Sequence, residues 1–266
     1  MRLCLLSLLT LILALATPAF AVDGVDGVLE INQTCAVQTG CFAGDTAGFP
    51  VTVGTTGASV RLTGNLTVSD ENTTAIQIVA DSVTLDLNGF SVIGTTVCSD
   101  TPVVSCASIG SGRGVDGLGS NGLAVLNGTI RQMGSDGITA NSGARIAGVR
   151  SIGNGQYGVR ADNGSVVEGS VANGNGLDGI FGDTSTIRDS VVRHNKRHGI
   201  NSFGSTVLGN TVTRNGGTGL NLGDATGYGN NQISGNAGGN QNPQISLDES
   251  GFEIAPNVCG GNLTCL

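Results

Sequence analysis

The sequence has 266 residues, of which 45 are glycine and 7 are cysteine, with two tyrosines and no tryptophan. Its 20 acidic residues outnumber its 12 Lys and Arg, which gives a formal net charge of −8 at pH 7. An acidic chain without basic tails is a poor match for nucleic acid or for an anionic membrane surface, so neither is an expected partner.

The first 21 residues have the pattern of a secretory signal peptide. Arg2 precedes an apolar run from residue 3 to residue 16, and small residues surround Ala21. This order predicts cleavage after Ala21. The run is too short for a membrane span. We therefore expect residues 22–266 to form a single secreted domain, periplasmic or extracellular, that does not insert into a membrane.

The six cysteines after the signal peptide lie in three close pairs. They are Cys35 and Cys41, Cys98 and Cys106, and Cys259 and Cys265. Other connectivities are possible, but proximity favours the three local ones. In an oxidising compartment we expect these pairs to be disulfides that staple loops. Zinc is disfavoured, because there is no C-x-x-C pair and the two histidines are far away in the sequence.

Taken in chain order, residues 22–50 are rich in glycine and are expected to cap the N-terminal end of the fold. From Val51 onward, short stretches of alternating apolar and polar residues predict strands, with a turn at Asn88-Gly89. Residues 94–119 are rich in Thr, Ser and Gly and contain the second cysteine pair. We interpret them as a disulfide-stapled insertion that projects from the wall of the fold.

Residues 137–236 repeat one pattern every 20–21 residues. Gly-apolar pairs begin at Gly137, Gly158, Gly179, Gly199 and Gly219. An apolar series runs through Ile146, Val167, Ile187, Val207 and Tyr228, and an asparagine series through Asn154, Asn175, Asn195, Asn215 and Asn236. Three series with the same spacing predict an all-β solenoid with three short strands in each coil and Ile and Val pointing inward.

The recurring asparagine is expected to be structural. Asparagine tolerates the left-handed backbone region better than other non-glycine residues, and its amide can bond the copy one coil away, across a strand spacing of ~4.8 Å. Beyond Asn236 the repeat lapses, and we expect residues 237–266 to form a C-terminal cap around the last cysteine pair.

Several motifs resemble those of a known group of proteins. They are Arg61-Leu62-Thr63-Gly64-Asn65-Leu66-Thr67-Val68, Thr74-Ala75-Ile76 and Val83-Thr84-Leu85-Asp86-Leu87-Asn88-Gly89-Phe90, followed by the repeated coils. Together they resemble bacterial secreted proteins with the right-handed parallel β-helix (pectate-lyase-like) fold, over roughly residues 28–240. The resemblance implies that architecture. Polysaccharide lyases, hydrolases, esterases, epimerases, adhesins and proteins without an assigned activity share it, so it does not decide function.

One candidate site lies on the outer side of the strands that carry the apolar series. Asp162, Glu168 and Asp183 are expected to be able to hold Ca²⁺ against a uronate carboxylate. Arg188 would then take the proton from C5 of the sugar in a polysaccharide lyase reaction. The competing interpretation is a surface ion pair between Glu168 and Arg188 on a shallow wall with short turns. The sequence favours the ion pair.

A second candidate is a basic patch on this acidic chain. It consists of Arg193, His194, Lys196, Arg197, His198 and Arg214. The patch offers contacts to an anionic polysaccharide, or a histidine as general base. A solvated, charged turn is the favoured interpretation. The sequence lacks the paired aspartates of polygalacturonase-type enzymes, the Asp-Pro-His-Glu motif of alginate epimerases and a Gly-x-Ser-x-Gly nucleophile motif.

The sequence thus predicts a secreted β-helix protein without a clear catalytic site. It favours a binding or structural role in the cell envelope or extracellular space, with polysaccharide as the candidate partner. The alternative is a calcium-dependent lyase acting on a uronate polymer, and Ca²⁺ is the one cofactor considered. The small number of aromatic residues argues against a carbohydrate platform built from exposed rings.

Overall fold

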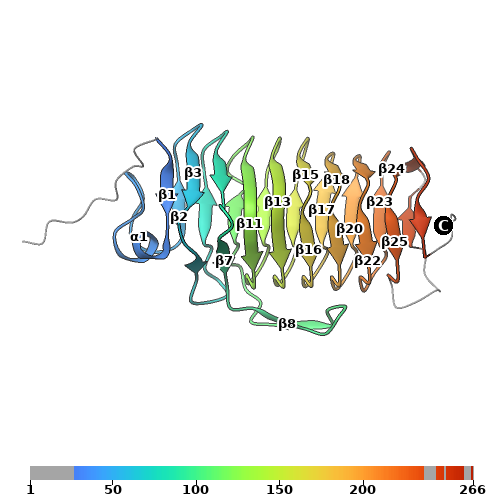
Figure 1. Ribbon diagram of the computed structural model, residues 1–266, viewed down its shortest axis with the longest axis horizontal. Coiled ribbons are helices and arrows are strands. Elements are labelled where there is room, and N and C mark those ends of the chain that lie inside the picture. Colours follow the sequence, from blue (N-terminus) through green and yellow to red (C-terminus); the bar gives the residue numbers. More distant parts are fainter. Residues whose placement is uncertain (1–26, 237–243, 249, 261–264, 266) are drawn as a thin grey trace, which may run out of the picture.

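The computed structural model describes residues 27–236, 244–248, 250–260 and 265. They form an elongated solenoid that begins at α1 (Gln33–Gln38) and advances coil by coil to β28 (Val258–Cys259) (Figure 1). The expected signal peptide, residues 1–21, and residues 237–243 lie outside the described part of the chain.

One wall of the solenoid is a nine-stranded parallel sheet. It contains β2 (Val51–Val53), β5 (Ile76–Ile78), β10 (Val115–Gly117), β12 (Ile138–Ala140), β14 (Val159–Ala161), β17 (Ile180–Asp183), β20 (Ile200–Phe203), β23 (Leu220–Gly223) and β26 (Ile245–Leu247), in that spatial order. Neighbours in the sheet are one coil apart in sequence. Val159 aligns with Ile180, and Ile180 aligns with Ile200.

The other walls belong to a seventeen-stranded sheet that forms two rows. The first row contains β1 (Leu29–Ile31), β3 (Ser59–Leu62), β6 (Thr84–Asp86), β15 (Val166–Glu168), β18 (Thr186–Arg188), β21 (Thr206–Leu208), β24 (Gly227–Gly229) and β27 (Phe252–Glu253). The second contains β4 (Leu66–Thr67), β7 (Ser91–Ile93), β16 (Val171–Asn173), β19 (Val191–Arg193), β22 (Thr211–Thr213), β25 (Gln232–Ser234) and β28. The long strands β11 (Ala124–Arg131) and β13 (Arg145–Ile152) run through both rows. Each regular coil therefore has three strands, and the predicted parallel β-helix is confirmed.

The interior is filled by the apolar series expected from the repeat. Ile146, Val167, Ile187 and Val207 are fully buried, and Tyr228 is 3% exposed. Burying one Val or Ile side chain contributes about 1.5–3 kcal/mol, so the stack is a main source of stability. The glycine directly before each strand from β10 to β23 of the nine-stranded sheet is needed for space. A Cβ on Gly179 would lie 2.3 Å from Val192 Cγ1.

Buried polar side chains form ladders at the corners of the coils. Between β16 and β17, the backbone N–H of Asn175 donates to Asn195 Oδ1 at 2.9 Å, and the N–H of Asn195 donates to Asn215 Oδ1 at 3.0 Å. Two further ladders were not expected from the sequence. They consist of Ser170, Ser190, Asn210, Asn231 and Asn257, and of Ser185, Ser205 and Thr226.

The left-handed residue at this corner is not the asparagine, which corrects the expectation. It is the residue before it, with a φ of +67° at Gly174, +58° at His194 and +54° at Arg214. The asparagine side chain then points inward and caps backbone groups of two coils. The left-handed backbone region is favourable for glycine and strained for most other residues. In two coils this position is occupied by His194 or Arg214, where glycine would fit best.

The ends and the insertion differ in detail from the predicted boundaries. Near the N-terminus, β1 already pairs with β3 as part of the first row, so only part of residues 22–50 lies outside the coils. Within residues 94–119, β8 (Val97–Ser99) and β9 (Ser105–Ala107) form an antiparallel hairpin, but β10 has rejoined the nine-stranded sheet. At the C-terminus, β26, β27 and β28 form a further coil inside the expected cap of residues 237–266.

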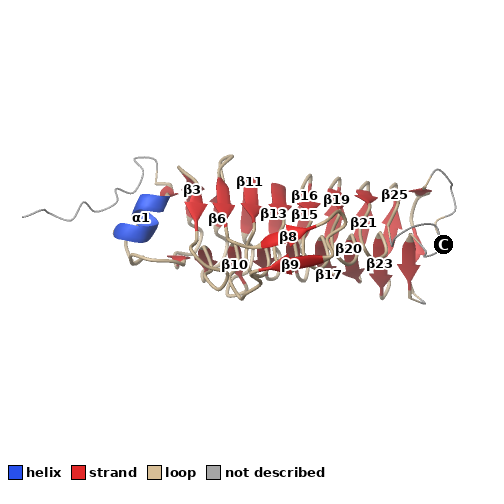
Figure 2. Ribbon diagram, turned by 90° about the horizontal axis from the view of Figure 1, so that it is seen from below, coloured by secondary structure: helices blue, strands red, loops and turns tan. Residues whose placement is uncertain are grey.

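The β8–β9 hairpin lies alongside the body of the solenoid (Figures 1 and 2). Its backbone bonds to the corner that precedes the nine-stranded sheet. Val103 N donates to His194 O at 3.1 Å, and Gly110 N donates to Gly134 O at 3.0 Å. The structure contains three local disulfides, Cys35–Cys41, Cys98–Cys106 and Cys259–Cys265.

Candidate functional site

The acidic residues considered for calcium do not come together. Glu168 on β15 accepts hydrogen bonds from Arg145, with Nη2 at 2.6 Å, and from Arg188. The hydrogen bond from Arg145, aided by the charge of Arg188, lowers the pKa of the Glu168 carboxyl. Asp162 instead lies near Arg160, with Arg160 Nε 3.7 Å from its carboxylate. Among the described residues, no group of three or more His, Cys, Asp or Glu is arranged to hold a metal ion.

Arg188, considered as the base of a lyase, therefore lies in an ion pair. Its side chain is 49% exposed, and Glu168 on the neighbouring coil engages its guanidinium. The third member of the calcium set, Asp183, accepts a hydrogen bond from Thr184 Oγ1 at 3.0 Å. The structure favours the interpretation of this wall as a surface ion-pair network.

The basic patch divides at the buried Asn195. On one side, His194 Nδ1 lies 3.3 Å from Asn173 Oδ1, beside the hairpin. On the other, His198 Nδ1 lies 2.7 Å from Thr218 Oγ1 at the entrance to β20. Burial lowers the pKa of both imidazoles. Arg193 and Lys196 are exposed, and Arg214 precedes its own ladder asparagine. The six residues thus belong to two surfaces.

The outer side of the nine-stranded sheet carries a denser set of functional side chains, which we call the nine-stranded face. Two positions in each coil build it. The entry row lies two residues before the first residue of each strand and contains Phe49, Thr74, Arg113, Asp136, Tyr157, Asp178, His198 and Thr218. The strand row lies at the second residue of each strand and contains Thr52, Gln77, Asp116, Thr139, Arg160, Phe181, Asn201, Asn221 and Ser246. Because side chains alternate along a strand, the strand row points away from the apolar core.

Two carboxylates of the entry row are buried and hydrogen-bonded. Asp136 is 3% exposed and accepts from Thr139 Oγ1 at 2.8 Å and from Tyr157 N at 3.1 Å. Asp178 is fully buried and accepts from Asn201 Nδ2 at 3.0 Å and from His198 N at 2.9 Å. Burial raises the pKa of the Asp136 carboxyl. Each aspartate thereby fixes the start of the next coil and a neighbouring polar side chain.

Arginines accompany these carboxylates. Arg113 Nη1 bonds Asp116 Oδ2 at 2.9 Å, and Arg113 Nε lies 3.6 Å from Asp136 Oδ2. Arg197 Nε lies 3.7 Å from Asp178 Oδ1. Within the described part of the chain, the buried Nε atoms of Arg113 and Arg160 have no hydrogen-bond partner, although a carboxylate lies within 4 Å of each. The face therefore carries guanidinium groups beside its carboxylates.

Three aromatic rings on successive coils lie in contact along this face: Tyr157 of the entry row, Phe181 of the strand row, and Phe203, two residues beyond the strand row on β20. The ring centroids of Tyr157 and Phe181 are 5.7 Å apart, and those of Phe181 and Phe203 are 6.2 Å apart. The Arg160 guanidinium carbon lies 5.6 Å from the Phe181 centroid. The three rings are half-buried, so each keeps a surface that faces solvent. The sequence analysis counted aromatic residues but did not foresee this row.

A signal for the face was present in the repeat. The residue before each Gly-apolar pair is Asp136, Tyr157, Asp178, His198 or Thr218, at the same spacing as the glycines. Acidic, aromatic, imidazole and hydroxyl side chains at one repeated position indicate a shared surface, because equivalent positions of a solenoid stack on one another. The sequence analysis examined the strands of the apolar series instead.

The chain is similar to several solved structures at low sequence identity, and the one with a TM-score above 0.5 shares its fold. The chain matches the Agl-KA catalytic domain with a TM-score of 0.54 and 15% identity, over 75% of this chain and 43% of that one. It matches the periplasmic alginate epimerase AlgG with a TM-score of 0.49 and 14% identity, over 76% of this chain and 59% of that one. For the AlgE4 A-module, a mannuronan C-5 epimerase of Azotobacter vinelandii, the values are 0.42, 16%, 82% and 70%. This chain thus spans less than half the length of the Agl-KA domain.

No curated protein matches the chain. Residues 89–262, more than half of the chain, match the family described as "Periplasmic copper-binding protein (NosD)". The protein therefore belongs to the NosD family.

Proposed function

We propose that this protein is a periplasmic binding protein that holds a polysaccharide along its nine-stranded face. The row formed by Tyr157, Phe181 and Phe203 is the observation that carries the proposal. Sugar rings present apolar C–H faces that pack on aromatic rings, while their hydroxyls need donors and acceptors at the edge of the contact. The arginine and asparagine side chains around the row supply both.

The repeat of the fold suits a polymer. Adjacent strands are ~4.8 Å apart, so three successive coils present stacking surfaces over ~10 Å of the solenoid axis. A chain that crosses the coils obliquely, from Tyr157 toward Phe203, meets one aromatic ring in each coil. The β8–β9 hairpin lies along the corner beside the entry row and limits the face on that side (Figure 2).

Binding fits this face better than catalysis does. Both oxygens of Asp136 and both oxygens of Asp178 accept hydrogen bonds from the protein. A carboxylate whose oxygens are both occupied by hydrogen bonds from the protein positions neighbouring groups and is not free to transfer a proton. The lyase alternative on the opposite wall requires Arg188 without its partner Glu168 and a calcium site, and the described residues do not supply that site.

The copper named in the family description does not fit the described residues. Copper sites in proteins use thiolate, thioether or imidazole ligands. The six described cysteines are in disulfides and Met133 is fully buried in the core. His194 and His198 lie on different surfaces, and no described group of three or more His, Cys, Asp or Glu includes either of them. We assign no copper-dependent step to this chain.

The proposed location rests on the family and on the sequence. The family description is periplasmic, and the first 21 residues read as a signal peptide. In the described part of the chain, none of the helices is long and apolar enough to cross a membrane.

A binding panel tests the proposal. The purified protein is titrated with neutral and uronate polysaccharides by isothermal calorimetry, together with the Phe181→Ala variant. At least one polysaccharide should bind, and Phe181→Ala should weaken it roughly tenfold, which corresponds to about 1.4 kcal/mol. Phe252→Ala is the matched control, because Phe252 is 54% exposed on the seventeen-stranded sheet. Equal losses in both variants, or no binding across the panel, would refute the proposal.

A further inference from the structure

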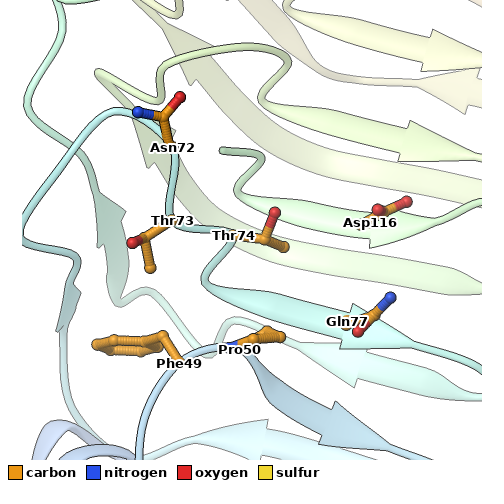
Figure 3. A pocket seen from close by; sticks show the side chains of 7 residues that line it. All are labelled: Phe49, Pro50, Asn72, Thr73, Thr74, Gln77 and Asp116. Atoms are coloured by element: carbon orange, nitrogen blue, oxygen red, sulfur yellow. The ribbon is translucent and has the colours of Figure 1, made fainter. Parts of the chain in front are cut away.

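A cavity lies at the N-terminal end of the nine-stranded face. Its volume is ≈ 300 Å³, and it is lined by Phe49, Pro50, Asn72, Thr73, Thr74, Gln77 and Asp116 (Figure 3). Small-molecule sites in proteins measure about 300–1,000 Å³. The cavity therefore has room for one small ring and not for a longer segment.

The cavity continues the two rows of the face. Phe49 and Thr74 belong to the entry row, and Gln77 and Asp116 to the strand row. Strand β2, which follows Phe49 and Pro50, is the first strand in the order of the sheet. A ligand that lies along the rows thus reaches this cavity at the end of the face.

The lining combines an apolar wall with polar groups that can still form hydrogen bonds to a ligand. Phe49 and Pro50 form one side, opposite Asn72, and Gln77 and Asp116 lie at the far end (Figure 3). Thr74 Oγ1 accepts from Arg113 N at 3.2 Å, so its hydroxyl proton remains available. Within the described part of the chain, the Gln77 amide makes no side-chain hydrogen bond, which leaves two donors and one acceptor for a ligand.

Charge restricts the ligand further. Asp116 is the one ionisable residue in the lining, and its carboxylate accepts from Arg113 Nη1 at 2.9 Å and from Leu118 N at 3.3 Å. A carboxylate has about four acceptor positions, so it can still accept from hydroxyl groups. An anionic ligand would meet this negative charge in a lining without a cation of its own.

We infer that the cavity binds a single uncharged sugar ring, the terminal residue of the polysaccharide held by the face. The inference rests on the proposed function and adds recognition of a chain end to it. The sugar packs one side on Phe49, and its hydroxyls bond Gln77, Thr74 and Asp116. An aromatic ring beside a carboxylate and an amide suits this chemistry, because hydroxyls both donate and accept.

Titration with monosaccharides tests the inference, with saturation-transfer NMR as the readout. The probes are glucose, galactose, mannose and N-acetylglucosamine, with glucuronate and galacturonate as charged counterparts. At least one neutral sugar should bind, with a Kd on the order of 1 mM, and the uronates should bind about tenfold more weakly. Gln77→Ala and Asp116→Asn should each weaken the neutral sugar about tenfold. Asp189→Asn should not, because Asp189 is 66% exposed at a corner of the seventeen-stranded sheet.

The outcomes separate this inference from the proposed function. If a polysaccharide binds and Phe181→Ala weakens it, but no neutral monosaccharide binds and Gln77→Ala changes nothing, the chain-end site is wrong and the binding face stands. Uronates that bind as tightly as neutral sugars would also overturn the inference. If a monosaccharide binds in a Gln77-dependent manner but no polysaccharide does, the cavity is a sugar site and the proposed function fails.

Discussion

Asp136 and Asp178 occupy equivalent positions two coils apart, and each carboxylate accepts a backbone N–H from the following coil. The other oxygen of each carboxylate accepts a hydrogen bond from a strand-row side chain, Thr139 or Asn201, and so orients it. Buried charge of this kind is costly unless it is fully bonded. The Asn201 amide, beside the aromatic rings, is therefore held in place by a carboxylate that a ligand would not touch.

The Asn195 side chain links three coils and gives a prediction for stability. It donates to Asn215 Oδ1 and Ala172 O and accepts from the N–H groups of Asn175. Asn195→Ala leaves buried polar groups without partners, at about 1–3 kcal/mol for each. We expect at least about 2 kcal/mol loss in the free energy of unfolding, measured with urea. Asn121→Ala, at an exposed turn, is the control and should change it by less than about 0.5 kcal/mol.

His198 gives a prediction for pH. Burial lowers the pKa of its imidazole below the ordinary value of 6.5, against the opposing charge of Asp178. Since the folded pKa lies below the unfolded one, the unfolded state takes up the proton first as the pH falls. The stability from neutral His198 is thus complete above the unfolded pKa and is lost as the pH falls below it.

Urea unfolding at about pH 7 and about pH 5 measures this contribution. His198→Gln should lose less stability between the two pH values than the wild type does. Lys196→Gln, an exposed change in the same turn, should follow the wild type. Parallel pH profiles for His198→Gln and the wild type would contradict the assignment.

Among the elements, the strand entrances of the nine-stranded sheet leave no room for a side chain at their glycines. A Cβ on Gly179 would lie 2.3 Å from Val192 Cγ1 and 2.5 Å from Asn195 Nδ2. Overpacking at a buried site costs about 1–3 kcal/mol, and here it also disturbs the asparagine ladder. Gly179→Ala should lower the free energy of unfolding by about 3 kcal/mol. Gly54→Ala is the matched control, since its Cβ would meet only Val79 Cγ2 at 3.8 Å, and a comparable loss there would refute the packing argument.

The hairpin is an element whose anchoring can be tested separately. Its two strands are joined by Cys98–Cys106, and its tip bonds to His194 through Val103. Replacing both cysteines with alanine removes a cross-link that restrains the unfolded chain, typically worth about 2–4 kcal/mol. We expect limited proteolysis, followed by mass spectrometry, to cut first within residues 97–107. Simultaneous cleavage throughout the solenoid would show that the hairpin is not a separate unit of stability.

The strands of the repeat could be predicted from sequence, and their boundaries at the ends could not. Val167 and Ile187 are fully buried. Because every coil needs an apolar residue at this position, the fixed spacing can be recognised in the sequence. The last coil lacks the pattern because Phe252, Ile254 and Val258 are exposed there, so apolar residues no longer mark the inside. The insertion boundary was missed because Val115 resumes the register while the surrounding residues remain rich in glycine.

At the scale of the whole molecule, the fold followed from the repeat but the candidate site did not. A solenoid has three outer walls, and the sequence placed a candidate site on the wall with Glu168 and Arg188, because Asp162 and Asp183 recur there on adjacent coils beside an arginine. Pairs of opposite charge form on any exposed wall. The face with Tyr157 and Phe181 differs because aromatic rings, arginines and buried carboxylates lie together on it, and that combination becomes visible only when both rows are aligned in three dimensions.

The central claim is that a polysaccharide occupies the nine-stranded face. Hydroxyl-radical footprinting with mass spectrometry tests it most directly, because it reports the solvent exposure of individual side chains with and without the polysaccharide that binds in the panel. We predict that the oxidation of Tyr157, Phe181 and Phe203 falls on binding, while that of Phe252 stays constant. Protection of Phe252, or unchanged oxidation of all three rings at a saturating concentration, would contradict the account.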